Sequence, residues 1–217
     1  MFSYQIMKQI KWPTIDSKHL IVESKQMSAL ENEMFSSGLP KEALMEKAGI
    51  QLSRWFLKRK SFLKDGIIII IGPGNNGGDG AVIARELFLK GYEVKIWCPF
   101  SLKKTLTINL VNYLTSIGVQ KLIEPPNPTE PGLWIDAVLG NNQRSKVDDE
   151  LIKIFERKFN TRLGNIVSLD IPTGLCPDTG KPFLNKAIQA HYTLVIGLYK
   201  IGLLQDSALP YVGKLHY

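Results

Sequence analysis

The sequence predicts an α/β protein built on a doubly wound sheet. Apolar runs that suit strands alternate with amphipathic runs that suit helices, which is the order that successive βαβ units produce. The clearest strand, residues 67–71, consists of five isoleucines next to a glycine, as expected for a strand buried on both faces of a parallel sheet. The 217 residues contain no internal repeat and are enough for one sizeable core. We therefore expect a single compact domain over 1–217.

Two helices are predicted ahead of that strand. The first covers residues 24–37 and is closed by Gly38, and the second covers 41–60 with Pro40 at its start. Apolar residues of the second helix recur at helical spacing, so one of its faces is apolar. Residues 1–23 are weakly patterned and are expected to form an N-terminal extension that wraps the domain.

The remaining elements alternate to the end of the chain. Helices are predicted over 79–90, 105–117 and 148–159, and strands over 94–98, 133–139, 165–169, 193–198 and 212–217. The helix over 148–159 has acidic residues in its first turn and basic residues in its last, which suits the helix dipole. The proline-rich stretch 125–131 is expected to be a loop, and the last strand to lie at an edge of the sheet.

Composition excludes several classes of protein. The net charge is +7, but the 27 Lys and Arg residues are spread along the chain, and the longest cluster, Lys58-Arg59-Lys60, lacks interleaved aromatic residues, so we expect no nucleic-acid partner. Cys98 and Cys176 lack metal-ligand spacing, which indicates ordinary thiols in a reducing compartment. No stretch reaches the ~18 apolar residues that a membrane span needs. We expect a cytoplasmic protein without membrane contact.

The ligand site is expected at the sheet edge where the carboxyl ends of the strands meet. Three predicted loops lie there, at residues 72–80, 136–146 and 170–174. The first has five glycines in nine positions, which allow positive φ angles and let backbone N–H groups approach a ligand. The following helix adds the attraction of its positive end, so we expect an anion there. The loop matches neither the GxGxxG fingerprint nor a P-loop.

Two aspartates at strand ends, Asp136 and Asp170, admit two interpretations. A carboxylate beside an apolar run needs a partner or a task, so each of them either bonds its own loop or serves the site. Together with Asn76 and Thr173 they supply hard oxygen ligands, which suit an alkali or alkaline-earth cation. Lys200 is either a solvated surface lysine or a side chain that reaches the mouth of the crevice.

At four places the sequence resembles the NAD(P)H-hydrate epimerases, the N-terminal domain of the YjeF type. Residues 72–80, Gly-Pro-Gly-Asn-Asn-Gly-Gly-Asp-Gly, look like the signature loop of that family, and residues 44–49 resemble its Leu-Met-Glu-Asn-Ala-Gly. Residues 136–140 resemble Asp-Ala-Leu-Phe-Gly, while 170–175 and 178–180 resemble Asp-Ile-Pro-Ser-Gly-Leu and Asp-Thr-Gly. The resemblance covers residues 20–217.

The resemblance implies a Rossmann-like three-layer αβα sandwich with a mostly parallel sheet, often dimeric. It implies an isomerase that interconverts the R and S epimers of hydrated NADH or NADPH, so that a partner dehydratase acting on the S form can restore the cofactor. One K⁺ per subunit is implied, with Asn76, Asp136 and Thr173 as ligands. Asp170 is implied to contact substrate, and we assign it the catalytic role of general acid and base. The substrate-binding residues implied are Asn75, Asn76, Gly77, Gly78, Asp79, Gly140, Asn141, Asn142, Gln143, Arg144, Ser145, Lys146 and Asp170.

The second loop departs from the family pattern. Where the family has Gly-Thr-Gly-Leu-Ser-Arg, residues 140–145 are Gly-Asn-Asn-Gln-Arg-Ser, so the arginine is either displaced by one position or functionally absent. Asn142 is expected to replace a glycine in left-handed geometry. Two alternatives therefore stay open. One is a catalytically inactive nucleotide-binding or scaffold module, and the other is the epimerase half of a bifunctional epimerase and dehydratase, because the chain ends in a predicted strand at Tyr217.

Overall fold

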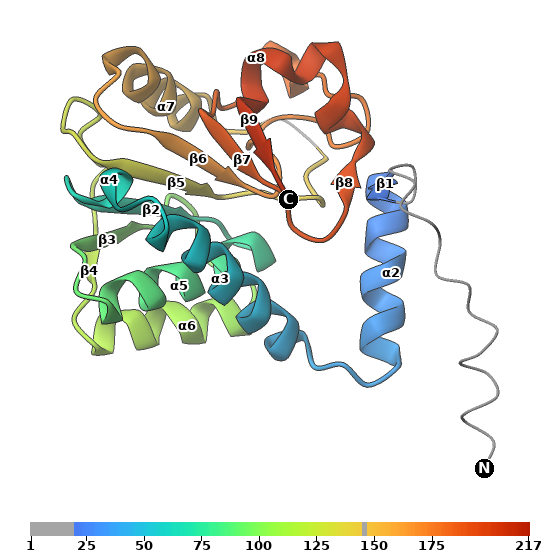
Figure 1. Cartoon of the computed structure of the whole chain (residues 1–217), viewed down its shortest axis with the longest axis horizontal. Helices are drawn as coiled ribbons and strands as arrows, with labels where there is room; N and C mark the ends of the chain where they lie inside the picture. The colour runs from blue at the N-terminus through green and yellow to red at the C-terminus, as the bar shows by residue number, and fades with distance from the viewer. Residues whose placement is uncertain (1–19, 145–146) are drawn as a thin grey trace.

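A seven-stranded sheet forms the middle layer of the protein (Figure 1). The structure is a computed structural model that describes residues 20–144 and 147–217. The strands are β2 (Ile67–Ile71), β3 (Val94–Trp97), β4 (Gln120–Leu122), β5 (Leu133–Ala137), β6 (Ile166–Leu169), β7 (Tyr192–Leu194) and β9 (Lys214–His216). Their order in the sheet is β4-β3-β2-β5-β6-β7-β9, and every neighbouring pair is parallel.

Helices cover both faces of this sheet (Figure 1). On one face lie α3 (Lys41–Leu57), α5 (Asn75–Leu89) and α6 (Thr105–Ser116). On the other lies α7 (Asp149–Thr161), with the short α8 (Leu209–Val212) on the same side. The predicted α/β class and three-layer αβα sandwich are confirmed.

The five isoleucines of β2 show why this strand is central. Ile67, Ile69 and Ile71 pack into the core shared with α3 and α5, whereas Ile70 packs with Trp134 into the core shared with α7. These four isoleucines are at most 1% exposed. Burying one such side chain contributes about 1.5–3 kcal/mol, so the strand stabilises both halves of the sandwich, as its sequence predicts.

Some predicted boundaries are wrong, and the local structure explains the differences. The helix predicted from residue 79 starts at Asn75, because the glycine loop itself forms its first turn. The helix predicted over 41–60 stops at Leu57, and α4 (Lys60–Leu63) follows as a separate turn. The strand predicted over 193–198 ends at Leu194, before the chain turns at Gly197 with φ 70°. β4 was not predicted because Gln-Lys-Leu has no apolar alternation.

A second, two-stranded sheet lies beside the sandwich. β1 (Ile21–Val22) pairs in parallel with β8 (Tyr199–Lys200), and Val22 stands opposite Lys200. α2 (Ser24–Ser36) follows β1 and stands apart from the two helical layers (Figure 1). It begins with a capping box between Glu23 and Gln26. Residues 1–19 of the predicted N-terminal extension lie outside the described residues.

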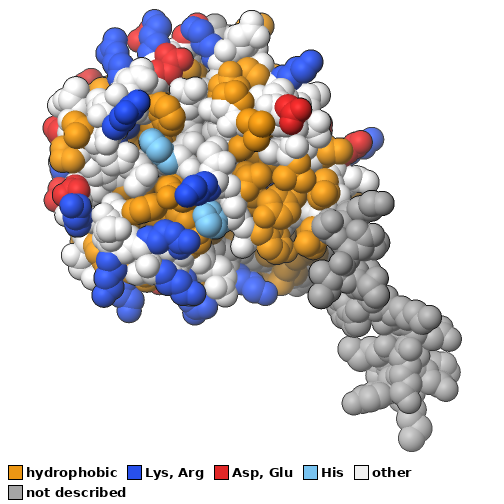
Figure 2. Space-filling view, turned by 45° about the horizontal axis from the view of Figure 1, so that its top comes forward, with side chains coloured by type: hydrophobic (Ala, Val, Ile, Leu, Met, Phe, Trp, Pro, Cys, Tyr) orange, Lys and Arg blue, Asp and Glu red, His pale blue; other side chains and the backbone are white. Residues whose placement is uncertain are grey.

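The charged side chains are mixed with other types on the surface (Figure 2). Lys and Arg side chains occur around much of the face seen in Figure 2, among acidic and hydrophobic side chains rather than in a single stripe. In the ranges 20–144 and 147–217, no helix is both long and apolar enough to cross a membrane. Cys98 and Cys176 are both free thiols.

Candidate active site

The three loops predicted to form the site meet at one edge of the sheet. β2, β5 and β6 are neighbours, so the loops that follow them leave adjacent carboxyl ends. Gly140 shows how closely they approach, because a Cβ atom there would lie 2.8 Å from Asp170 Oδ2 and 3.4 Å from Asn76 Cγ. A side chain at this position would force Asp170 to shift, and the edge expected from the sequence is the one where these side chains gather.

The glycines of the first loop serve close packing rather than unusual backbone conformation. None of the five has a positive φ, contrary to the expectation from the sequence. A Cβ on Gly72 would lie 1.8 Å from the carbonyl oxygen of Val138, and one on Gly80 would lie 2.5 Å from the Cβ of Ala137. Gly74 is different, because nothing lies within 4 Å of its Cβ position. Its backbone is therefore the part of the loop that a ligand can approach.

The start of α5 supplies backbone donors for an anion. Gly74 is the N-cap, so the N–H groups of residues 74–77 precede the first intrahelical hydrogen bond, whereas those of residues 78 and 79 fall within the helix. No side chain in the described part of the chain caps this end. The positive end of the helix dipole favours negative charge there. Of the predicted substrate-binding segment 75–79, the first three residues thus have free amides.

Asp136 lies at the end of β5 and accepts four hydrogen bonds. One carboxylate oxygen accepts from the Thr173 hydroxyl at 2.7 Å and from the N–H of Val138 at 3.2 Å. The other accepts from the Ser168 hydroxyl at 2.8 Å and from the N–H of Thr173 at 2.9 Å. Burial raises the pKa of Asp136, and these donors lower it in part. Of the two interpretations of Asp136, its contacts match the loop-bonding one, because they tie β5 and β6 to the 170–174 loop.

Asn76 carries an oxygen without a partner next to this network. Its Oδ1 is buried and accepts no hydrogen bond from the described residues, while its amide nitrogen donates to the carbonyl of Leu169 at 3.4 Å. No group of three or more His, Cys, Asp or Glu side chains within 20–144 and 147–217 is placed to hold a metal ion. An amide oxygen, a hydroxyl and a single carboxylate fit a hard monovalent cation better than a transition metal. The residues predicted as K⁺ ligands therefore fit the ion chemically.

Asp170 follows β6 and forms a buried ion pair. Lys200 Nζ donates to Asp170 Oδ1 at 2.5 Å and to the carbonyl of Ile196 at 2.6 Å, and the N–H of Asn141 donates to Asp170 Oδ2 at 2.7 Å. The Lys200 side chain is 1% exposed and that of Asp170 is 9% exposed. Lys200 is therefore not a solvated surface lysine but the counter-ion of Asp170. Asp170 also has φ 66°, a left-handed conformation that is uncommon outside glycine.

Asn141 and Asn142 connect the second loop to α2. Asn141 Nδ2 donates to the carbonyl of Ser24 at 2.9 Å and to the hydroxyl of Ser28 at 3.2 Å, and Asn142 Oδ1 accepts from the Ser28 hydroxyl at 3.1 Å. The prediction of left-handed geometry for Asn142 is wrong, because this residue does not have a positive φ. Asn141 Oδ1 is buried without a partner among the described residues, which leaves one acceptor for a ligand.

Gln143 and Arg144 hold the rest of this loop. Gln143 accepts from the N–H of Gly174 at 2.7 Å and donates to the carbonyl of Pro172 at 3.3 Å, so it fixes the turn behind Asp170. The Arg144 guanidinium donates to the carbonyls of Asn141 and Gln143, each at 2.9 Å. The displaced arginine is thus bonded to its own loop. Ser145 and Lys146 lie outside the described residues.

The charge of Asp170 acts on two further carboxyl groups. Burial raises the pKa of Asp79 well above its usual range, and the charges of Asp170 and Glu31 raise it further while Lys200 lowers it. Burial also raises the pKa of Glu31 on α2, with the same opposing effects of Asp170 and Lys200. Glu31 belongs to no motif and was missed by the sequence prediction. Its one signal is its place on the helical face that also carries Ser24 and Ser28.

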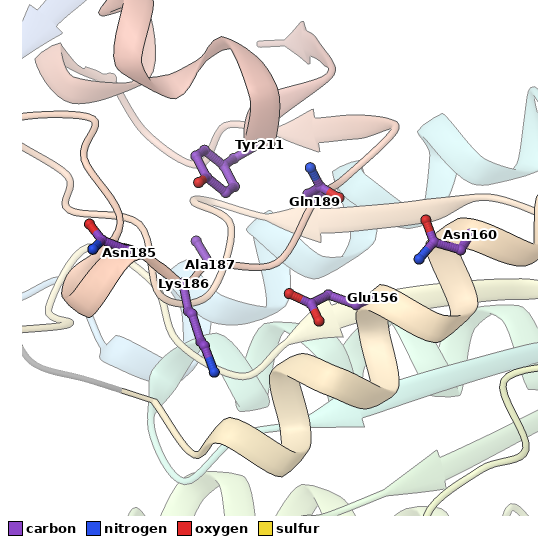
Figure 3. Close-up of a pocket in the computed structure, with 7 residues that line it drawn as sticks. All are labelled: Glu156, Asn160, Asn185, Lys186, Ala187, Gln189 and Tyr211. Atoms are coloured by element: carbon purple, nitrogen blue, oxygen red, sulfur yellow. The ribbon is translucent and has the colours of Figure 1, made fainter.

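A polar pocket lies elsewhere, along the flank of α7. It has a volume of about 300 Å³ and is lined by Glu156, Asn160, Asn185, Lys186, Ala187, Gln189 and Tyr211 (Figure 3). None of these residues belongs to the predicted site. Two of them, Lys186 and Ala187, pack against Gly174, so the pocket borders the 170–174 loop without sharing residues with the predicted site.

The chain is a parallel α/β sandwich with an open helix N-terminus and a buried Asp–Lys pair at one sheet edge, and in folds of this class ligands bind at the carboxyl ends of the strands. The sequence model of one family, described as "YjeF-related protein N-terminus", matches residues 41–202. This chain belongs to that family, which confirms the resemblance found in its motifs.

Known relatives and a solved structure agree with this membership. A "Bifunctional NAD(P)H-hydrate repair enzyme Nnr" from Thermosynechococcus vestitus is 38% identical over 195 residues, which cover 89% of this chain and 38% of the relative. An "NAD(P)H-hydrate epimerase" from Lentilactobacillus buchneri is 32% identical and is matched over 83% of its length, with 82% of this chain covered. The crystal structure of the yeast protein ynu0 superimposes with a TM-score of 0.73 at 26% identity, covering 84% of this chain and 82% of that one. The chain thus spans 38% of the length of the Thermosynechococcus relative.

Proposed function

We propose that this protein is an NAD(P)H-hydrate epimerase, which interconverts the R and S epimers of hydrated NADH or NADPH. Relatives named as NAD(P)H-hydrate epimerases or repair enzymes, matched over most of this chain, support the proposal. The observation that carries it is the buried pair of Asp170 and Lys200, at the same sheet edge as the open N-terminus of α5. The pair can exchange a proton with the hydroxyl group on the nicotinamide ring, and the helix N-terminus can bind the phosphates of the same molecule.

Epimerisation requires the hydroxyl-bearing ring carbon to lose its hydroxyl group and regain it from the other face. When the C–O bond breaks, its electrons leave with the oxygen, which takes up a proton and departs as water. The lone pair of the adjacent ring nitrogen then forms a C=N bond with the carbon. Water adds back from the other face and gives up a proton. The protein must therefore provide one group that donates a proton and one that accepts it.

Asp170 is suited to take up and return a proton. Lys200 and the N–H of Asn141 each bond one of its two oxygens, so further lone pairs stay available to substrate. Burial raises the pKa of Asp79 well above its usual range, so this carboxyl group can donate a hydrogen bond in its protonated form. Both groups are shielded from solvent, which strengthens their interactions with charge that develops on the ring.

We further propose one K⁺ per subunit, with Asn76, Asp136 and Thr173 as ligands. The unpartnered Oδ1 of buried Asn76 supports this proposal. When bound, the ion would supply positive charge that offsets a buried carboxylate and the substrate diphosphate. Asn76 would then be held in place by an ion on one side and by the carbonyl of Leu169 on the other.

A cytoplasmic homodimer with an NAD(P)H-hydrate dehydratase as its functional partner completes the proposal. Large apolar side chains exposed on α2 and in the C-terminal segment support self-association. They are Leu30, Met34, Leu204, Leu209 and Tyr217. Hydrophobic side chains also gather on one part of the face in Figure 2. The name of the bifunctional relatives supports a second repair activity that acts on the same substrate.

The test is turnover of an isolated epimer. Purified protein is incubated with the R epimer of hydrated NADH, with and without K⁺, and the S epimer is followed by chromatography. We expect conversion faster than the spontaneous rate, and Asp170→Asn is expected to lower kcat by ~10²–10⁴. The exposed Asp65 provides the matched control, since Asp65→Asn should leave kcat unchanged. The spontaneous rate with wild-type protein under both conditions would refute the function.

A further inference from the structure

Helix α2 is attached directly over the loops of the site. The N–H and hydroxyl of Ser24 donate to the two carboxylate oxygens of Asp178 at 2.6 and 2.7 Å. The Ser24 carbonyl accepts from Asn141, whose own N–H is bonded to Asp170. Just before the helix, Val22 pairs with Lys200, the counter-ion of Asp170. The N-terminal half of α2 is therefore linked to both members of the ion pair.

One face of α2 is turned toward these contacts. Ser24, Met27, Ser28 and Glu31 follow the spacing i, i+3, i+4 and i+7, which places them on one side of a helix. Ser24 is 2% and Met27 7% exposed, whereas Glu33 on the same helix is fully on the exposed side. Glu31 lies about 4.5 Å further along the helix axis than Ser28. The helix thus carries Glu31 along the wall of the site.

The charges around Glu31 come from three other elements. Asp170 of the loop after β6 and Lys200 of β8 both act on it, and Glu31 in turn acts on Asp79 of α5. Glu31 is partly exposed, so it has contact with solvent while the charges of Asp170 and Lys200 act on it. Asp79 and Lys200, by comparison, are buried. Glu31 is also outside the segment 41–202 that the family model matches.

We propose that Glu31 is a second catalytic acid–base group of the site, which exchanges protons between the substrate hydroxyl and solvent while Asp170 serves the opposite face. This inference rests on the proposed epimerase function. In the R-to-S direction, protonated Glu31 gives its proton to the departing hydroxyl, which leaves as water as the C=N bond forms. Water adds to the other face, and the Asp170 carboxylate takes its proton. Glu31 then recovers a proton from solvent and Asp170 releases one, so no net charge is gained or lost.

The partial exposure of Glu31 distinguishes it from Asp79 in this role. Glu31 is partly exposed and can regain from water the proton that it gives to the departing hydroxyl, whereas Asp79 is buried. The raised pKa of Glu31, caused by burial and by the charge of Asp170, lets it hold a proton closer to neutral pH than an exposed glutamate does. Two carboxyl groups in different environments can thus divide the two proton transfers.

The experiment compares Glu31→Gln with Glu33→Gln, a matched change of an exposed glutamate on the same helix. Initial rates with the isolated R epimer are measured from about pH 5 to about pH 9, on both sides of neutrality. Thermal unfolding checks the fold of each variant. Glu31→Gln is expected to lower kcat by ~10²–10⁴ with KM changed by less than about threefold. It should also remove the decline in kcat at high pH, where wild-type Glu31 loses its proton. Glu31→Asp should restore part of the rate.

The outcomes separate this inference from the function on which it rests. Wild-type turnover together with unchanged kcat and an unchanged pH profile in Glu31→Gln would overturn the role of Glu31 and leave the epimerase intact. A rise in KM at constant kcat would also overturn it, since that result indicates a contact with bound substrate only. A wild-type protein no faster than the spontaneous reaction would overturn the epimerase function, and the role of Glu31 with it.

Discussion

Asp136 and Asp170 lie at the ends of neighbouring strands, yet their surroundings differ in kind. Asp136 accepts four hydrogen bonds from uncharged donors, all from β6 and the adjoining loops. Asp170 accepts from one ammonium group and one backbone N–H, and it acts on two other carboxyl groups, Asp79 and Glu31. The first arrangement fixes loops, whereas the second concentrates charge that can move protons. Buried carboxylates at one sheet edge can therefore serve structure and chemistry side by side.

The largest effect is expected where the charge-balanced pair is broken. Lys200→Met leaves Asp170 buried without its counter-ion, so we expect a loss of about 3–5 kcal/mol in the free energy of unfolding. Urea denaturation measures it, with Lys47→Met on the exposed side of α3 as the matched control. The double variant Lys200→Met/Asp170→Asn should regain part of the loss. Equal stability of Lys200→Met and wild type would show that the pair is not needed to balance the buried charge.

A smaller effect is expected in the network of neutral donors. Thr173→Val keeps the shape of the side chain but removes the hydroxyl that donates to Asp136 and accepts from the N–H of Leu139. We expect a loss of about 1–3 kcal/mol from the unsatisfied buried groups. Thr173→Ser retains the hydroxyl and should lose less than about half of that amount. Chemical denaturation measures both losses of stability, and equal losses in the two variants would contradict the hydrogen-bond explanation.

The last effect depends on pH. The folded protein holds the proton of Asp79 at pH values where the unfolded chain, with its ordinary pKa of 3.8, has lost it. Stability is therefore highest at low pH with respect to this group and falls as pH rises from 3.8 through the raised pKa. Asp79→Asn should flatten that decline by about 1.4 kcal/mol for each unit by which the pKa is raised. Chemical denaturation of wild type and Asp79→Asn at several pH values between acidic and neutral measures how stability depends on pH. Parallel stability curves for the two proteins would contradict this prediction.

Much of the fold and the edge of the site could be predicted because local sequence determines them. The isoleucines of β2 specify a doubly buried strand on their own, and Asp136 and Asp170 follow apolar runs whose strand ends must lie side by side. The importance of the glycines in the first loop was predicted, but positive φ angles are not the reason for them. Gly72 is required by its approach to Val138 rather than by its φ, and such an approach depends on a residue far away in the chain.

What the sequence could not predict depends on contacts between distant segments. Lys200 is buried in β8, which pairs with the distant β1, yet Tyr-Lys-Ile-Gly carries no pattern that indicates this. Glu31 joins the site through the bonds between Ser24, Ser28 and the asparagines of the second loop. The same bonds hold the second loop, which departs from the family pattern, against α2. The N–H of Asn141 in this loop still donates to Asp170.

The left-handed backbone at Asp170 restricts which residues can replace this aspartate during evolution. A β-branched or bulky residue at φ 66° is costly, whereas Asn and Gly adopt that conformation readily. A copy of this domain that loses its chemistry but keeps its fold should therefore carry Asn or Gly here more often than Ala or Val. The same restriction makes Asp170→Asn the clean laboratory substitution, because it removes the charge without changing the turn. In this family, an Asn directly after β6 would thus mark a homologue that folds but has lost its activity.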